Sequence, residues 1–463
     1  MNAEPEGKGI PAKAKTAGKK VKGISYTRIV ALGYFALVIV GTLLLMLPVS
    51  SKSGLATPFF DALTTATSAS CVTGLIVYDT FTHWSIFGQL VILALIQIGG
   101  LGYMTVIALL SVIFRRRINV RERRLLKEST NSLYIGGLIA LTKRIISGTV
   151  IFEGLGAVVL SVRFSGIFGL KRGIYYGIFH SVSAFCNAGF DLMGIIEPYS
   201  SMTYFNSDPV VLITLSILII MGGIGFMVWD DAVKNKLRFR KYSLHSKIAV
   251  VTSLALILFG SVTIFGFEYN GALAGMSAGD KILNSVFASI SARTAGFNSF
   301  ELSSLTPGST LVNVLLMLIG GSPGSTAGGL KTTTFAVLII AARANIRNRK
   351  HVNVFGRRLE NDIIRKALTV SVIYMLFAFA SVLLIGFTNP SLSLDTLAFE
   401  ISSAIGTVGL SAGGMSRLNL FGQLLITLLM YCGRVGSMSF AMVFTEDKAP
   451  TDVMMPSEKI VIG

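Results

Sequence analysis

The sequence predicts an all-α membrane protein in which one unit occurs four times, each unit consisting of two transmembrane helices with a re-entrant loop between them. Three observations lead to this fold class. The chain of 463 residues is 52% hydrophobic and only 14% charged, a composition typical of proteins whose solvent is mostly lipid. Eight apolar stretches reach the length of a membrane span, and four similar polar segments, each ending in a glycine, fall between them. The predicted arrangement has eight transmembrane helices and four re-entrant loops in pseudo-four-fold order around a central pore.

Each of the eight apolar stretches provides the roughly 20 residues that an α-helix needs to cross a bilayer. Lipid offers no hydrogen bonds to the backbone, so these stretches must form helices or a closed barrel, and their unbroken apolar runs favour helices. The expected spans are Arg28–Val49, Ser85–Phe114, Ile145–Phe164, Val210–Val233, Ile248–Glu268, Thr310–Ala342, Leu368–Phe387 and Phe421–Phe444.

The basic residues predict how the chain is oriented. A net charge of +18 would also suit a nucleic-acid-binding protein, but the basic residues cluster before the first span and after the second, fourth and sixth spans. The other connections carry acidic residues, and this positive-inside pattern predicts a multi-pass plasma-membrane protein with both termini in the cytoplasm. The clusters are therefore interpreted as topology determinants that contact anionic lipid, and no nucleic acid is expected as a partner.

The spans and loops divide the chain into a tail and four units. Residues 1–24 are rich in Lys, Ala, Gly and Pro and are expected to form a basic disordered cytoplasmic tail. Unit 1 covers 25–128, unit 2 covers 129–240, unit 3 covers 241–350 and contains a broken second helix, and unit 4 covers 351–463 with a short C-terminal tail.

The repeat is visible in the polar segments themselves, which read Ser-Cys-Val-Thr-Gly74, Phe-Cys-Asn-Ala-Gly189, Ala-Arg-Thr-Ala-Gly296 and Ile-Gly-Thr-Val-Gly409. Their glycines are 115 (189 − 74), 107 (296 − 189) and 113 (409 − 296) residues apart. The second span of each unit then carries a glycine-containing break, which starts at Gly99, Gly222, Gly320 and Gly433. In the first two units, close packing of helices is the favoured interpretation of these glycines.

Four such loops on one axis predict a path for ions. Non-helical backbone is tolerated inside a membrane only where it is buried in protein or lines a watery cavity. Inward-facing carbonyls can replace the water that a dehydrated cation loses, and glycine reaches the backbone angles that the turn requires. The predicted ion-binding backbone consists of Val72, Thr73, Gly74, Asn187, Ala188, Gly189, Thr294, Ala295, Gly296, Thr407, Val408 and Gly409.

Short pore helices are expected before each of these loops. Their C-terminal dipole ends would favour a cation at the loop. The expected pore helices are Phe59–Ser70, Ile174–Phe185, Lys281–Ala292 and Leu394–Ile405.

This pattern of four membrane–loop–membrane units, with one glycine in each loop, resembles the Ktr/Trk/HKT superfamily of potassium transporters. The resemblance runs from about Tyr26 to Gly463 and is strongest to the membrane subunit of bacterial Ktr systems. It implies K+ uptake, a homodimer in which every protomer has its own pore, and docking on a cytoplasmic ring of RCK-type nucleotide-binding subunits. Gly74 matches the potassium-preferring pattern of the family, whereas a single glycine per loop leaves partial passage of Na+ open. No organic cofactor and no enzymatic activity are expected.

The third unit departs from the others because small residues interrupt its second span near mid-membrane. The order Gly-Leu-Lys at 329–331 breaks the Gly-Lys pair that a phosphate-binding P-loop requires. In the family, this segment lies beneath the filter and gates the pore. The predicted gate residues are Gly320, Gly321, Ser322, Pro323, Gly324, Ser325, Thr326, Ala327, Gly328, Gly329, Lys331 and Arg434.

The charged and titratable residues near the loops have competing interpretations. Lys331 would place a positive charge near the ion path, and Arg434 would brace the interrupted segment through backbone carbonyls or lie at the cavity wall. Alternatively, both pair with acidic groups such as Glu153, Asp230 or Asp231. Arg293 is expected to point behind the filter to Glu400, and His180 is expected to be a packing residue rather than a ligand.

Three functional hypotheses follow from these patterns. The first is channel-like K+ conduction, gated by residues 320–334 and regulated by the RCK subunit. The second is a sodium/potassium symporter or sodium-permeable cation transporter of the same fold. The third is a secondary carrier that binds its substrate at the midplane between inverted repeats. Inverted repeats would run antiparallel, whereas basic loops on one side make all four units parallel, which favours the pore.

Overall fold

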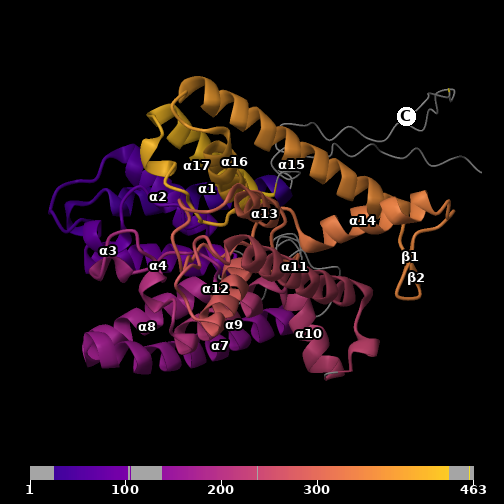
Figure 1. The fold of residues 1–463 in the computed structure, drawn as a ribbon, viewed down its shortest axis with the longest axis horizontal. Helices are drawn as coiled ribbons and strands as arrows, with labels where there is room; N and C mark the ends of the chain where they lie inside the picture. Colours follow the sequence, from indigo (N-terminus) through magenta and orange to yellow (C-terminus); the bar gives the residue numbers. More distant parts are fainter. Residues whose placement is uncertain (1–25, 103–104, 106–137, 237, 437–457, 459–463) are drawn as a thin grey trace, which may run out of the picture.

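The computed structural model describes residues 26–102, 105, 138–236, 238–436 and 458, and helices make up nearly all of their regular secondary structure (Figure 1). The expected N-terminal tail, the basic segment 115–127 and the chain from 437 onward, except residue 458, lie outside the described residues.

The helices of the first two units follow the expected order. Unit 1 contains α1 (Tyr26–Leu45), α2 (Phe59–Cys71), the single turn α3 (Thr80–His83) and α4 (Ile86–Leu101). Unit 2 contains α7 (Leu138–Phe168), α8 (Leu170–Phe185), α9 (Pro209–Gly223) and α10 (Phe226–Asn235).

The last two units repeat this order. Unit 3 contains α11 (Leu244–Glu268), α12 (Ala278–Ser291), α13 (Pro307–Leu318) and α14 (Thr332–Ile346). Unit 4 contains α15 (Asn361–Thr388), α16 (Leu394–Gly406) and α17 (Leu420–Val435). Between units 3 and 4, strands β1 (Asn353–Val354) and β2 (Arg357–Arg358) pair antiparallel.

The boundaries of these helices follow local sequence signals. Asp208 precedes Pro209 and accepts hydrogen bonds from the N–H groups of Val210 and Val211, which satisfies donors that the first helical turn leaves free. Proline is suited to the first turn because it has no N–H to satisfy. The side chains of Ser85, Ser243, Ser277, Thr306, Ser393 and Asn419 cap α4, α11, α12, α13, α16 and α17 in the same way.

The expectation of eight long spans is only partly met by continuous helices. Among the described residues, four helices are long and apolar enough to cross a membrane, namely α1, α7, α11 and α15, which are the first helices of the four units. The span expected over Val210–Val233 is instead a pair of helices, α9 and α10, bent by 93°. Gly225 lies at this bend with φ +101°, a conformation that glycine adopts without a steric penalty. The span expected over Thr310–Ala342 is divided into α13 and α14 by the non-helical residues 319–331.

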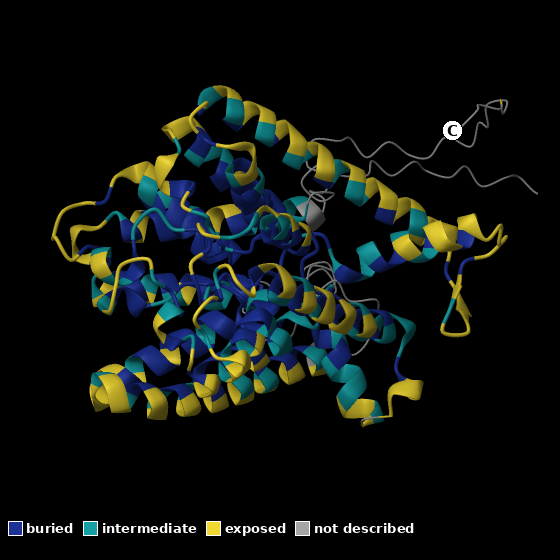
Figure 2. Cartoon of the chain, viewed as in Figure 1, coloured by how far each residue is buried: buried dark blue, intermediate teal, exposed yellow. Residues whose placement is uncertain are grey.

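The buried core lies at the centre of the molecule and the outer helix faces are exposed. Figure 2 shows buried residues gathered in the middle, with exposed residues along the outer sides of α7 and α15. Only 17% of the apolar stretch of α15 is buried, and its exposed side chains include Leu376, Phe379 and Phe387. An exposed helix face of this composition is expected in contact with lipid.

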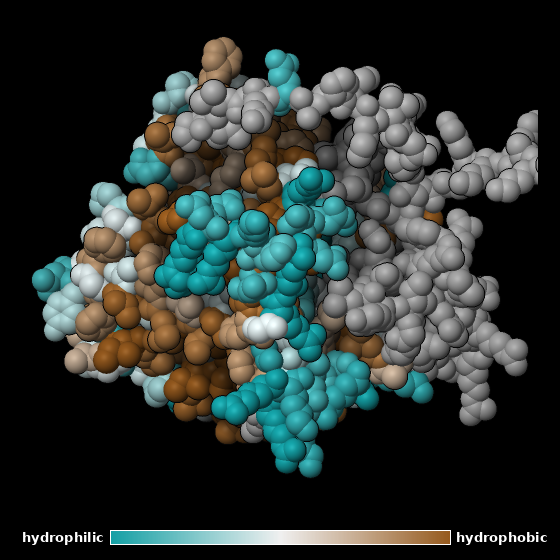
Figure 3. Space-filling model, turned by 90° about the vertical axis from the view of Figure 1, so that its right-hand side faces the viewer, coloured by the Kyte–Doolittle hydropathy of each residue, from teal (hydrophilic) through white to brown (hydrophobic). Residues whose placement is uncertain are grey.

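One end of the molecule carries exposed basic residues. The β1–β2 hairpin, which the sequence pattern did not predict, projects at this end beyond α14 (Figure 1). Figure 3 faces this end and shows hydrophilic side chains gathered near the centre, flanked by hydrophobic ones. The exposed basic residues of this region include Arg343, Arg347, Arg349, Lys350, Arg357, Arg358, Arg365 and Lys366.

Candidate functional site

All four glycine loops have the same backbone conformation. The glycines have φ values of +94°, +71°, +84° and +97° in chain order, and the residue two positions earlier also has a positive φ in every loop. Those earlier residues are Val72 (+57°), Asn187 (+60°), Thr294 (+75°) and Thr407 (+50°). The short helices expected before the loops are present as α2, α8, α12 and α16. The repeat seen in the sequence is therefore also a repeat of conformation.

The four glycines form a ring, called here the glycine ring (Gly74, Gly189, Gly296 and Gly409). A Cβ atom placed on any of them would meet the carbonyl oxygen that precedes the glycine of the next unit, at 2.5 Å for Gly74 and 2.8 Å for Gly189. The pairs of glycine and carbonyl are Gly74 with Ala188, Gly189 with Ala295, Gly296 with Val408, and Gly409 with Thr73. The units thus follow one another in the order 1, 2, 3, 4 and back to 1, so units 1 and 3 lie opposite each other, as do units 2 and 4.

Each loop is hydrogen-bonded to the helix that precedes it. The N–H of Gly74 donates to Ser68 Oγ at 3.0 Å, and the N–H of Gly409 donates to Ser403 Oγ at 3.1 Å. In units 2 and 3, serine hydroxyls of the pore helices instead donate to the carbonyls of Phe190 and Phe297.

The N–H groups of the residues before the glycines all bond back to the pore helices. Among the described residues, no donor reaches the carbonyl oxygens of Thr73, Ala188, Ala295 or Val408. These carbonyls therefore remain available for a ligand that accepts lone pairs, such as a cation.

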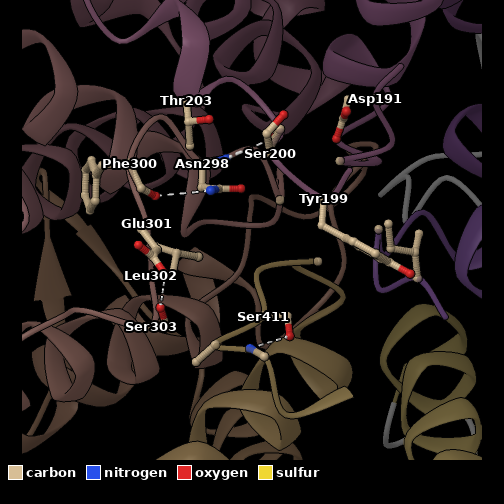
Figure 4. Close-up of a pocket in the computed structure, with 18 of the residues that line it drawn as sticks. Asp191, Tyr199, Ser200, Thr203, Asn298, Phe300, Glu301, Leu302, Ser303 and Ser411 are labelled. Carbon is tan, nitrogen blue, oxygen red and sulfur yellow. Dashed lines mark hydrogen bonds between the residues drawn. The ribbon is translucent and has the colours of Figure 1, made fainter. Parts of the chain in front are cut away.

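An open cavity, called here the outer cavity, lies on one side of the glycine ring. It has a volume of about 730 Å³ and is lined by all four ring glycines. Asp191, Glu197 and Glu301 also line it, whereas its described lining residues include no Lys or Arg. Figure 4 shows side chains from three separate loops, among them Asp191, Asn298 and Ser411, arranged around the open space. Carboxylates concentrated in a cavity attract cations.

Asp191, which lines the outer cavity, has a pKa well above the ordinary value of an aspartate. It lies in the loop between α8 and α9, outside the spanning helices, and its Oδ1 accepts a hydrogen bond from the N–H of Met193 at 2.9 Å. The pKa of Asp191 is raised to about 7, mainly because the carboxyl group is buried. The hydrogen bond from the Met193 N–H lowers this pKa and the nearby Asp79 carboxylate raises it, and the value of about 7 is the balance of the three effects.

The non-helical residues 319–331, called here the interrupting loop, lie against the bend of unit 2 and against the glycine loops. Ser322 N donates to Gly223 O at 2.9 Å, and Phe226 N donates to Gly324 O at 2.7 Å. Thr326 Oγ1 donates to Asn187 Oδ1 at 3.1 Å. A Cβ atom on Gly328 would meet the side chain of Thr407. The loop therefore contacts Asn187 and Thr407 of two glycine loops, and its Gly320 carbonyl also accepts a hydrogen bond from Arg293 of a third.

The two bases expected near the ion path, Lys331 and Arg434, both bond to backbone carbonyls. Lys331 Nζ donates to Ala327 O at 2.7 Å and to Gly328 O at 3.3 Å, so its side chain bonds to its own loop. The Arg434 guanidinium donates to Thr326 O and to the carbonyls of Gly99 and Gly100. The expected contact of Arg434 with backbone carbonyls of the interrupting loop is therefore present, at Thr326 O.

The alternative partners expected for these bases are occupied elsewhere. Glu153 accepts from Gln97 at 3.1 Å, Asp230 pairs with Arg144 and Lys234, and Asp231 accepts from the hydroxyls of Ser243 and Ser246. The alternative prediction, that Lys331 and Arg434 pair with these acidic residues, is therefore wrong.

The expectation for Arg293 is also wrong. Its guanidinium donates to Ser253 O at 3.2 Å, to Ser253 Oγ at 3.3 Å and to Gly320 O at 3.4 Å, not to Glu400. Glu400 is instead bonded to the loop that follows the unit 4 glycine. The partners of Arg293 are oxygens of Ser253 in α11 and the carbonyl of Gly320 in the interrupting loop, and no sequence spacing indicates that the fold brings these groups together.

The glycines of the second helices combine close packing with a break. A Cβ atom on Gly99, Gly222 or Gly433 would meet a backbone carbonyl at the end of the pore helix of the same unit, so the expected close packing is present. Three residues after each of these, Gly102, Gly225 and Gly436 have φ values of +79°, +101° and +93° with ψ between 126° and 133°. The helix thus ends or bends at the same place in units 1, 2 and 4.

Comparisons with known proteins place these features in a family context. Residues 25–460 match a family model named TrkH and described as a cation transport protein. The chain is 38% identical to the Ktr system potassium uptake protein B of Bacillus subtilis, over 96% of this chain and 99% of that protein. It is also 38% identical to the potassium/sodium uptake protein NtpJ of Enterococcus hirae, over 96% and 98% of the two chains.

A solved structure shares the fold. The crystal structure of the potassium transporter TrkH from Vibrio parahaemolyticus matches with a TM-score of 0.71 over 92% of this chain and 86% of that chain. The two sequences are 16% identical, so this similarity shows the fold alone.

Proposed function

This chain belongs to the TrkH family of cation transport proteins, and on that premise we propose that it is the ion-translocating membrane subunit of a potassium uptake system. It conducts K+ in a channel-like manner, down the electrochemical gradient, through a filter with one glycine per loop. The observation that carries the proposal is the glycine ring, because each of its members leaves room for the preceding carbonyl of the next unit. A side chain at any of these positions would occupy the space that the carbonyls use.

The proposed filter is the backbone of the twelve residues predicted from the sequence, three in each loop. The free carbonyls of Thr73, Ala188, Ala295 and Val408 would supply one layer of oxygen ligands for a dehydrated ion. The acidic outer cavity would collect cations above this layer. The C-terminal ends of four pore helices would add a favourable potential at the ring.

The interrupting loop is proposed as the gate, together with Lys331 and Arg434. Its glycines and small hydroxyl residues fill the space next to Asn187 and Thr407, so ions leaving the ring would have to pass it. We expect a chain shortened within 321–328 to leak cations without a cytoplasmic partner. Flux that still depended wholly on that partner would remove the gating role.

The wider assembly is proposed from the relatives. The Ktr proteins are named as parts of a system, and we propose a homodimer docked on an RCK-type nucleotide-binding ring at the basic end of the molecule. The four units would be residues 25–128, 129–240, 241–350 and 351–463, in the plasma membrane with both termini cytoplasmic. Anionic lipid would contact the exposed arginines of this end.

A sodium-permeable transporter of the same fold is the second candidate. The name of the Enterococcus hirae relative includes sodium as well as potassium, and one glycine per loop provides fewer oxygen layers than a long filter would. The two candidates predict different competition between K+ and Na+.

The test is uptake of radioactive rubidium into vesicles that contain the purified protein, with and without the RCK partner. We expect uptake that excess K+ suppresses more strongly than Na+ and that the partner modulates. Equal suppression by both ions would favour the second candidate. Absence of any cation flux from correctly inserted protein would overturn the pore itself.

A further inference from the structure

Two buried side chains occupy the same place behind opposite filter loops. Counted nine residues back from the ring glycines, the four units have Thr65, His180, Phe287 and Glu400. His180 is fully buried and Glu400 is 2% exposed. They belong to units 2 and 4, which lie across the ring from each other.

Both side chains accept a hydrogen bond from the same position of the non-helical segment that follows the ring glycine. His180 Nε2 accepts from the N–H of Leu192 at 3.2 Å, and Glu400 Oε1 accepts from the N–H of Ala412 at 3.0 Å. Leu192 and Ala412 are each three residues after the ring glycine of their unit (192 − 189 and 412 − 409). Two different residue types thus make one equivalent hydrogen bond between the pore helix and the segment that follows the ring glycine.

The shared property of these two residues is the acceptor atom and not the charge. His180 Nδ1 lies 2.7 Å from the carbonyl oxygen of Tyr176 and must donate to it, so Nε2 is the unprotonated acceptor of a neutral ring. Glu400 uses Oε1 alone, which also accepts from Ser411 Oγ at 2.7 Å and Gly414 N at 2.9 Å. Its Oε2 has no hydrogen-bond partner among the described residues.

The other pair of opposite units is built differently at this position. Thr65 Oγ1 donates to Asp61 O at 2.9 Å within its own helix, and Phe287 offers no hydrogen-bonding group. Among the described residues, a buried acceptor at this position therefore holds the segment after the glycine only in units 2 and 4, which lie opposite each other. Asp191 and Ser411 belong to these two segments and line the outer cavity (Figure 4).

We propose that His180 and Glu400 are positioning residues. Each accepts a hydrogen bond from the segment that follows its ring glycine, and these two bonds hold opposite sides of the proposed filter in place. They thereby set the width of the ring, and with it the preference for K+ over Na+. The proposal rests on the proposed function, because it concerns the selectivity of that same ring. Ligand oxygens held at a fixed spacing compensate one ion size better than another. Without this hydrogen bond, the segment could move inward, and the ring would then fit the smaller Na+ as well.

The experiment compares variants that keep or remove the acceptor at similar side-chain size. Glu400→Gln and His180→Gln retain an acceptor oxygen, whereas Glu400→Leu and His180→Leu do not. Glu400→Asp keeps the charge but is one methylene too short to reach the Ala412 N–H. Thr65→Ser is the control at the equivalent place in unit 1. The readout is the ratio of K+ to Na+ concentrations that halve rubidium uptake into vesicles, which a purely structural role would not move.

We expect both Leu variants and Glu400→Asp to take up rubidium with the K+ preference reduced about tenfold, equivalent to about 1.4 kcal/mol. The Gln variants and Thr65→Ser should stay within about twofold of the parent ratio. An unchanged ratio in Glu400→Asp, or a ratio in Glu400→Gln as low as in Glu400→Leu, would overturn the proposal, the second by showing that charge is needed. If the Leu variants do not assemble, Glu400→Asp and Glu400→Gln still decide. A parent protein without rubidium uptake would instead refute the proposed function.

Discussion

At the scale of single residues, each glycine loop has a positive φ at two positions, and glycine occupies only one of them. The other position is occupied by Val72, Asn187, Thr294 and Thr407. Three of these are β-branched, for which a left-handed conformation is uncommon and costs about 1–3 kcal/mol. Such strain persists only where the surrounding structure enforces it, and here each loop is fastened to its pore helix. The strain is consistent with a site whose backbone geometry matters more than its stability.

Replacement of the first ring glycine should reduce selectivity. A serine Cβ at Gly74 would lie 2.5 Å from Ala188 O and 3.2 Å from the Cα atoms of two neighbouring ring glycines, so the ring must widen. We expect Gly74→Ser to lower the preference for K+ over Na+ about tenfold, or about 1.4 kcal/mol. Gly275→Ser is the matched control, because Gly275 has φ +81° and a Cβ atom placed on it would meet nothing within 4 Å. Uptake competition curves that coincide for Gly74→Ser and the parent would contradict the expectation.

The acidity of Asp191 predicts a pH dependence of uptake. With its pKa at about 7, Asp191 is mostly neutral at about pH 6 and mostly ionised at about pH 8. The added negative charge joins Asp79, Glu197 and Glu301 and raises the local cation concentration as the pH increases. The apparent KM for rubidium should therefore fall between these pH values.

The matched variants separate Asp191 from the other carboxylates of the outer cavity. Asp191→Asn should show a high KM with little pH dependence over this range, whereas Glu301→Gln should keep the pH dependence of the parent. A parent KM that is flat between about pH 6 and pH 8 would contradict the role of Asp191.

At the scale of elements, groups from two other units hold the interrupting loop, and one of these groups also binds unit 1. Gly222, Gly223 and Phe226 come from the bend of unit 2, and Arg434 comes from the end of α17 in unit 4. The same guanidinium reaches Gly99 and Gly100 at the end of α4 in unit 1. One side chain therefore joins the second helices of units 1 and 4 to the loop of unit 3.

Removal of this guanidinium should free the loop. Hydrogen bonds to a charged group contribute about 1.5–3 kcal/mol each, so loss of one of them corresponds to at least about a tenfold shift toward a displaced loop. We expect Arg434→Gln to raise rubidium uptake in the absence of the RCK partner by about this factor. Arg417→Gln is the control, because Arg417 is exposed and donates to the surface carbonyl of Ser391 at 3.1 Å. Partner-independent uptake that stayed at the parent level in Arg434→Gln would show that the loop is held without it.

Sequence patterns predicted where the helices lie better than where the helices are interrupted and which residues contact each other. The apolar spans and the glycine repeat placed the first helices and pore helices correctly, because hydropathy and spacing are local signals. The 93° bend between α9 and α10 was missed, because a glycine inside an apolar run is compatible with both a packed helix and a broken one. The partners of Arg293 and the shared role of His180 and Glu400 were missed because they depend on which carbonyls and N–H groups the fold brings close. Aligning the four units on their ring glycines would have shown that His180 and Glu400 occupy equivalent positions.

At the scale of the whole molecule, charge is distributed along the direction that an ion would follow. The outer cavity carries Asp191, Glu197 and Glu301, and the other end carries the exposed arginines around the β1–β2 hairpin. The glycine loop of unit 4 and the interrupting loop contact each other through Thr407 and Gly328. This order, with acidic and basic ends separated by apolar outer helix faces, matches the positive-inside pattern of a membrane protein.

Labelling of single cysteines tests this orientation directly. The native thiols Cys71, Cys186 and Cys432 are buried, with at most 3% exposure, so they give little background with a membrane-impermeant maleimide. Leu55 is 72% exposed in the loop before α2, and Phe355 is 48% exposed at the tip of the hairpin. Because the basic end should face the cytoplasm, Leu55→Cys should react in intact cells and Phe355→Cys only after the membrane is permeabilised. Reaction of both variants in intact cells would place the two ends on one side of the membrane, and a pore running between them would then be excluded.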